Sequence, residues 1–173
     1  MKIPNNLPQF EDSKTLIMVT GSKAEAHFYL AYNGEVEKLD SFKMEDRTYS
    51  DKEGFMQKGM FGRTMGSGFV LEAKKKKIQD DFIKNLRKHL EKIKDRNEIG
   101  SLYLFSPSHI KNRIKDAIPH PMDKKIKMVA QGNYQNEHPM KLIEKIKDID
   151  RKENKGLKFV KESAYKILNK VKK

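Results

Sequence analysis

The sequence contains no cysteine and no tryptophan among its 173 residues. The lack of cysteine excludes disulfide scaffolds, cysteine zinc sites, thiol catalysis and iron–sulfur clusters. No apolar run approaches the about 18 residues of a membrane span, and the opening segment lacks the apolar core of a signal peptide, so we expect a cytoplasmic protein. The five histidines have no metal-ligand spacing, and we expect neither a metal ion nor another cofactor.

Positive charge is what the sequence has in excess. Lysine and arginine number 37 against 24 acidic residues, which gives a formal charge of +13 and a pI near 9.7. A surface of this charge attracts polyanions such as nucleic acid or acidic lipid. Hydrophobic residues make up 36% of the chain and the mean hydropathy is −0.83, which is polar but sufficient for one folded domain.

More than half of this excess lies at the end of the chain. Residues 151–173 hold nine lysines and arginines and two glutamates. The same segment has apolar residues at three- and four-residue spacing, namely Leu157, Val160, Ala164, Ile167, Leu168 and Val171. This spacing predicts a basic amphipathic helix. Three interpretations are open for it: a helix docked on the domain with solvated lysines, a nucleic-acid-binding arm, or a membrane-surface helix.

The first part of the chain predicts a sheet. Residues 1–14 are polar and contain two prolines, so we expect a flexible or loosely docked leader. Runs of β-branched, apolar and aromatic residues predict antiparallel strands at 15–20, 25–32 and 35–43. The Asn33-Gly34 pair between the second and third runs is typical of a tight hairpin turn.

Strands and helices alternate in the second part. Apolar residues at four-residue steps predict a long helix over 73–96, and strands are predicted at 101–106 and 125–130. Another helix is predicted within 106–118, and a last one opens at Pro139. This order predicts an α/β domain over residues 15–150, with a mixed five-stranded sheet and helices packed over it.

Several stretches of the sequence resemble a known family. TLIMVTGSKAEAHFYLAYNGEVEKL, then GRTMGSG, SLYLFSPSHIKNRI and KIKMVAQGNYQNEHPMKLIEKI resemble the bacterial host-attachment proteins. These are relatives of the middle domain of eukaryotic-type peptide-chain release factors and of Pelota. The resemblance covers residues 14–149. It implies the release-factor middle-domain topology, shared with ribosomal L18/S11-like proteins and broadly RNase H-like, in which the loop before the long helix reaches the ribosomal catalytic centre.

The loop before the long helix departs from the release factors. They carry Gly-Gly-Gln there, whereas in this chain no glutamine follows Gly62, Gly66 and Gly68. Gln57 precedes these glycines and Gln79 lies within the predicted helix. Peptidyl-tRNA hydrolysis is therefore not carried over. Because the chain also lacks a nucleophile elbow and a set of strand-borne acids for magnesium, we expect a binding protein more than an enzyme.

The glycine-rich segment 45–71 and the lysines after it form the best candidate site. Glycines let the backbone approach a phosphate closely, Arg63 can hold a phosphate with two hydrogen bonds, and the lysines of 74–77 add attraction. Four lysines in the first helical turn would oppose the helix dipole, which suggests a function for them. The alternative is a mobile loop followed by solvated lysines. The candidate RNA-binding residues are Lys58, Gly62, Arg63, Gly66, Gly68, Lys74, Lys75, Lys76, Lys77, Lys158, Lys161, Lys166 and Lys170.

These features predict a non-catalytic, translation-associated protein that binds ribosomal RNA, the ribosome or another structured RNA. One alternative is a hydrolase acting on RNA or peptidyl-tRNA. Another is an envelope or host-attachment protein with a lipid-binding basic tail. The aromatic residues in the predicted strands, Phe28, Tyr29, Tyr32, Tyr103 and Phe105, are expected in the core rather than as platforms for bases.

Overall fold

The computed structural model describes residues 1–21, 24–44 and 68–152, and of residues 68–75 it describes the helical backbone alone. The strands are β1 (Thr15–Thr20), β2 (Glu25–Tyr32), β3 (Glu35–Lys43), β4 (Ser101–Ser106) and β5 (Ile126–Gln131). The helices are α1 (Gly68–Arg96), α2 (Lys111–Ala117) and the short 3₁₀ helix η1 (Met122–Lys125). A further helix begins at residue 139 and continues to residue 152, where the described part of the chain ends.

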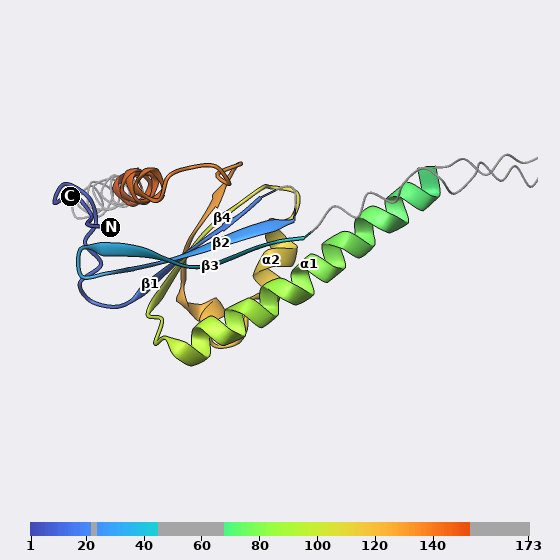
Figure 1. The fold of residues 1–173 in the computed structure, drawn as a ribbon. Coiled ribbons are helices and arrows are strands. Elements are labelled where there is room, and N and C mark those ends of the chain that lie inside the picture. Colours follow the sequence, from blue (N-terminus) through green and yellow to red (C-terminus); the bar gives the residue numbers. More distant parts are fainter. Residues whose placement is uncertain (22–23, 45–67, 153–173) are drawn as a thin grey trace, which may run out of the picture.

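The five strands form one mixed sheet in the order β3-β2-β1-β4-β5. β2 is antiparallel to both of its neighbours, whereas β1, β4 and β5 run parallel. Figure 1 shows α1 and α2 on one face of the sheet and the 139–152 helix, in orange, on the other. The predicted α/β class and the mixed five-stranded sheet are thus confirmed.

The central strand β1 explains why the layers hold together. All six of its residues are buried, because helices cover the sheet on both sides. Leu16 and Met18 belong to the apolar cluster beneath α1 and α2. Ile17 and Val19 belong to the cluster beneath the 139–152 helix. The alternation of side chains along one strand therefore supplies both cores.

Helix α1 is longer than its apolar pattern predicted. Phe82, Leu86 and Leu90 are buried against the sheet, as their four-residue steps predict. The helix, however, begins at Gly68 rather than near residue 73, so the last residues of the glycine-rich segment are helical. The lysines of 74–77 consequently lie beyond the first turn. Our argument that they oppose the helix dipole was wrong, since the dipole acts within the first turn.

The first residues of the chain are packed rather than flexible, which corrects our prediction for residues 1–14. Ile3 and Leu7 are 4% and 7% exposed and join the cluster beneath the 139–152 helix. The Ile3 amide donates to the carbonyl of Gly34 at 2.7 Å, and the Val36 amide donates to the carbonyl of Met1 at 2.8 Å. The leader therefore gains both apolar burial and backbone pairing along the β2–β3 hairpin.

One predicted turn is confirmed, whereas the start of α2 differs from the prediction. The Asn33-Gly34 hairpin has positive φ at both residues, as predicted. In contrast, α2 begins only at Lys111, and Ser106 is the last residue of β4. The Ser106 hydroxyl donates to the carbonyl of Pro107 at 3.1 Å instead of capping a helix.

Candidate nucleic-acid interface

The structure describes only part of the candidate set predicted from sequence. Lys58, Gly62, Arg63, Gly66, Lys158, Lys161, Lys166 and Lys170 lie outside the described residues. Gly68 is the first residue of α1, and Lys74 and Lys75 lie on its described backbone. Lys76 and Lys77 are exposed on the same helix. The described candidates are therefore all carried by α1.

The outer side of α1 holds further lysines that the sequence analysis did not single out. With 3.6 residues per turn, positions 77, 84, 88 and 92 fall on the side of the helix away from the buried Leu86. Lys77, Lys84, Lys88 and Lys92 are all exposed, and we call them the outer lysine row. Their seven- and four-residue spacing was the signal in the sequence that could have found them.

Helix α1 carries more positive than negative charge. The 29 residues of α1 include ten lysines and arginines and five acidic residues. Within the described part of the chain, no ion pair joins a member of the outer lysine row to a carboxylate. Arg87 is paired with Glu91 at 3.5 Å, and both are largely exposed. The ammonium groups of the row are therefore available to an anion from solution.

The opposite side of α1 packs against the domain. His89 Nδ1 lies 2.5 Å from Asp40 Oδ2 on β3, and its ring stacks on Phe42 with the centroids 4.5 Å apart. Towards α2, Arg113 donates to the side chains of Gln79 and Asp80. These contacts join α1 to both neighbouring elements.

Figure 1 shows how this attachment places the helix. The C-terminal part of α1 lies along the sheet, and the end at Gly68 extends well beyond it. A helix of 29 residues is about 43 Å long. The projecting end follows directly on residues 45–67 of the glycine-rich segment, which lie outside the described residues.

A second polar cluster lies at the end of β1. Glu25 Oε1 is 3.0 Å from His27 Nε2, and Glu25 Oε2 accepts a 2.5 Å hydrogen bond from Gln135. His27 Nδ1 is buried and has no hydrogen-bond partner among the residues that the structure describes. Gln135 also occupies the space that a side chain at Gly21 would need. The sequence analysis missed this cluster, although two residues on one strand separated by one position face the same side.

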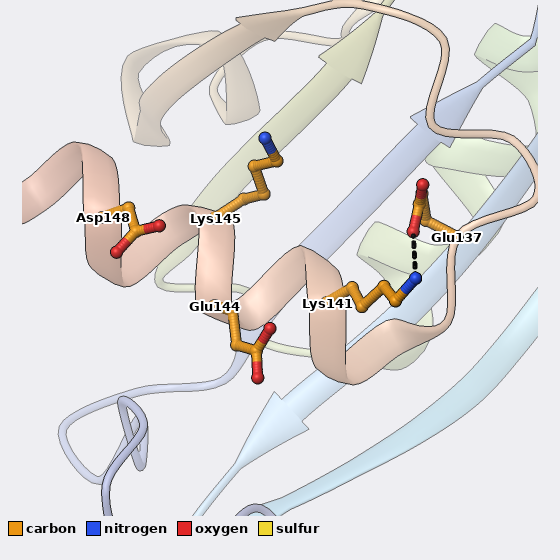
Figure 2. Close-up of a pocket in the computed structure, with 5 residues that line it drawn as sticks. All are labelled: Glu137, Lys141, Glu144, Lys145 and Asp148. Atoms are coloured by element: carbon orange, nitrogen blue, oxygen red, sulfur yellow. Dashed lines mark ion pairs between the residues drawn. The ribbon is translucent and has the colours of Figure 1, made fainter.

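A hollow of about 220 Å³ lies along the start of the 139–152 helix (Figure 2). It is lined by Glu137, Lys141, Glu144, Lys145 and Asp148. Lys141 and Glu137 form an ion pair at 3.5 Å, and Figure 2 shows Glu144 and Lys145 extending to opposite sides of the helix. With three carboxylates and two ammonium groups, this hollow does not suit a phosphate.

The aromatic residues of the strands are mostly in the core, as predicted. Phe28 and Phe105 are fully buried, and Tyr29 and Tyr103 are half-buried. Burial raises the pKa of Tyr29 above its usual value of 10.0. Tyr32 departs from the prediction, since it is 45% exposed at the hairpin tip.

The described residues form neither a candidate metal site nor a candidate membrane span. Among them, no group of three or more histidine, aspartate or glutamate residues is arranged to hold a metal ion. No helix in these same ranges is both long and apolar enough to cross a bilayer.

Comparisons with known proteins add little to this picture. No family model matches the sequence, and no curated protein matches it. A solved structure described as "Archaeal protein" is similar to 87% of this chain, with 12% sequence identity and a TM-score of 0.36. The match covers 41% of that protein's chain, so this chain corresponds to about two fifths of its length.

Proposed function

We propose that this protein is non-catalytic and binds structured RNA such as that of the ribosome. The observation that carries the proposal is the outer lysine row on a helix whose other side is fixed to the domain and whose end projects beyond it. Exposed lysines attract a phosphate backbone and release its counterions. A rigid helix fixes the backbone positions from which the lysine side chains extend, which lowers the entropy lost on binding.

The resemblance to release-factor middle domains supports the same proposal. The mixed sheet fits the broadly RNase H-like topology that the resemblance implies, and α1 leaves the domain at the end where those proteins present their loop. Under this proposal the glycine-rich segment with Arg63 and the basic segment 151–173 add further phosphate contacts, and the protein works in the cytoplasm.

The proposal is tested by measuring binding of the full chain to ribosomes and to a structured RNA over a range of salt concentrations. We expect micromolar or tighter binding at about 0.1 M salt, with affinity falling steeply as salt rises. The double variant Lys84→Ala and Lys88→Ala should reduce the slope of log affinity against log salt by about 2, because each lysine lost removes about one phosphate contact.

A matched control comes from β3. Lys38 and Lys43 are exposed, and replacing both by alanine changes the net charge by the same amount as the α1 double variant. The control should leave the slope nearly unchanged. Absence of RNA binding at about 0.1 M salt would overturn the proposal, and equal losses from both pairs would show that bulk charge, not α1, is responsible. RNA cleavage or release of peptide from peptidyl-tRNA by the full chain would instead favour the hydrolase alternative.

A further inference from the structure

We infer that the outer lysine row recognises the phosphate backbone of double-helical RNA rather than a single strand. This inference rests on the proposed function and names the form of RNA that the same surface takes. It is carried by the chemistry of the side chains along α1 and by the straightness of the helix that holds them.

The cations of the outer lysine row are ammonium groups. Of the arginines near them, Arg113 is engaged by Gln79 and Asp80, Arg87 lies beside Glu91, and the exposed Arg96 follows the row at the end of α1. Guanidinium groups stack on bases and form a planar pair of hydrogen bonds with a guanine edge. Lysine binds phosphate as a point charge, and such contacts carry no sequence information.

The rings on the described part of α1 face the sheet. Phe82 is 3% exposed and packs against Phe42 with the centroids 5.5 Å apart. His89 stacks on the same Phe42 ring and is paired with Asp40. Proteins that hold single strands commonly stack bases on exposed rings. A nucleic acid on the outer lysine row is instead held by its phosphates, which suits a duplex whose bases are paired inside.

The geometry of the row also favours a duplex. Lys77 and Lys92 are 15 positions apart, which on a helix is about 22 Å. Double-stranded DNA, which serves as a guide to the charge density of a duplex, presents about one phosphate charge per 1.7 Å of its axis, or about 13 over this length, and one strand presents half as many. A duplex offers these charges in a stiff array, whereas a single strand must first be ordered along the row.

The test compares three probes with the full chain at one salt concentration: an RNA duplex of about 20 base pairs, one of its strands alone, and a DNA duplex of the same sequence. We expect the RNA duplex to bind at least about fivefold more tightly than the single strand, and the DNA duplex to bind within about threefold of the RNA duplex. Lys84→Glu with Lys88→Glu should weaken duplex binding by about tenfold or more, and the control Lys38→Glu with Lys43→Glu should not.

Each outcome decides a separate question. Equal or tighter binding of the single strand overturns this inference and leaves the proposed function in place. If neither RNA binds, the proposed function fails as well. A preference for the DNA duplex by more than about tenfold overturns the inference, because the row is inferred to recognise the backbone of double-helical RNA. If the β3 control loses as much duplex binding as the α1 variant, the outer lysine row is not the binding site. Unchanged circular dichroism of both variants establishes that the comparison is made between folded proteins.

Discussion

Leu7 offers a direct test of whether the first residues of the chain belong to the folded domain. Its side chain is 7% exposed and lies in the cluster that contains Leu142, Ile143 and Ile146 of the 139–152 helix. Replacing a buried leucine by alanine costs about 2–5 kcal/mol. Because a peripheral segment relaxes more easily than a central strand, we expect Leu7→Ala to cost about 2 kcal/mol at the lower end of that range.

Urea denaturation followed by circular dichroism measures this cost. With a slope of about 2 kcal/mol per molar urea, the unfolding midpoint of Leu7→Ala should fall by about 1 M. The exposed neighbour Asn5 provides the control, and Asn5→Ala should change the free energy of unfolding by less than about 0.5 kcal/mol. If both variants unfold at the midpoint of the unchanged protein, residues 1–14 do not contribute to the core and the packing described for them is refuted.

Three further predictions follow from individual contacts. Gly100→Ala should lower the free energy of unfolding by about 1–3 kcal/mol in the same assay, because a Cβ there would lie 2.3 Å from Ser13 Oγ. Thr15→Val should cost about 1–3 kcal/mol by leaving the buried Ser101 hydroxyl without its 2.7 Å partner, and adding Ser101→Ala should recover part of that loss. In an ultraviolet absorbance titration, Tyr29 should ionise at a higher pH than an ordinary tyrosine, because burial raises its pKa above 10.0. Since its pKa is raised in the folded state, its contribution to stability is present below pH 10.0 and is lost as the pH rises through the raised pKa. Tyr29→Phe should abolish that loss.

Local patterns were sufficient to predict most of the sheet. The bounds of β1, β2 and β3 follow from runs of β-branched and aromatic residues around the Asn33-Gly34 turn, because turn chemistry and strand preference are both local. The leader could not be predicted in this way. Its polar composition suggests disorder, but Ile3 and Leu7 are buried by residues more than a hundred positions away. Burial against distant residues outweighs local preference.

The candidate interface was predictable only in part. Charge and periodicity predicted a long helix that carries the lysines of 74–77, and the same periodicity could have placed Lys84, Lys88 and Lys92 on its solvent side. They were not enough to show that Arg113 is engaged by Gln79 and Asp80, or that His89 pairs with Asp40, 49 positions earlier. Contacts of this kind depend on how α2 and β3 are placed against α1. They decide which basic groups remain available, and so they change the interpretation of the same sequence.

The division of α1 into two sides makes binding and stability separable. The side toward the sheet holds Phe82, Leu86 and Leu90, so substitutions there remove core contacts. The outer lysine row forms no ion pair among the described residues, and its side chains are exposed. A change of charge there therefore alters the free energy of unfolding by only about 0.5 kcal/mol.

Asp81 lies on this exposed side, between Lys77 and Lys84, and its carboxylate repels a phosphate backbone. If the row binds RNA, Asp81→Asn should tighten binding while leaving the unfolding midpoint unchanged, whereas Asp116→Asn on α2 should do neither. A core effect would move the midpoint instead, so the two measurements together distinguish a binding surface from a merely solvated one.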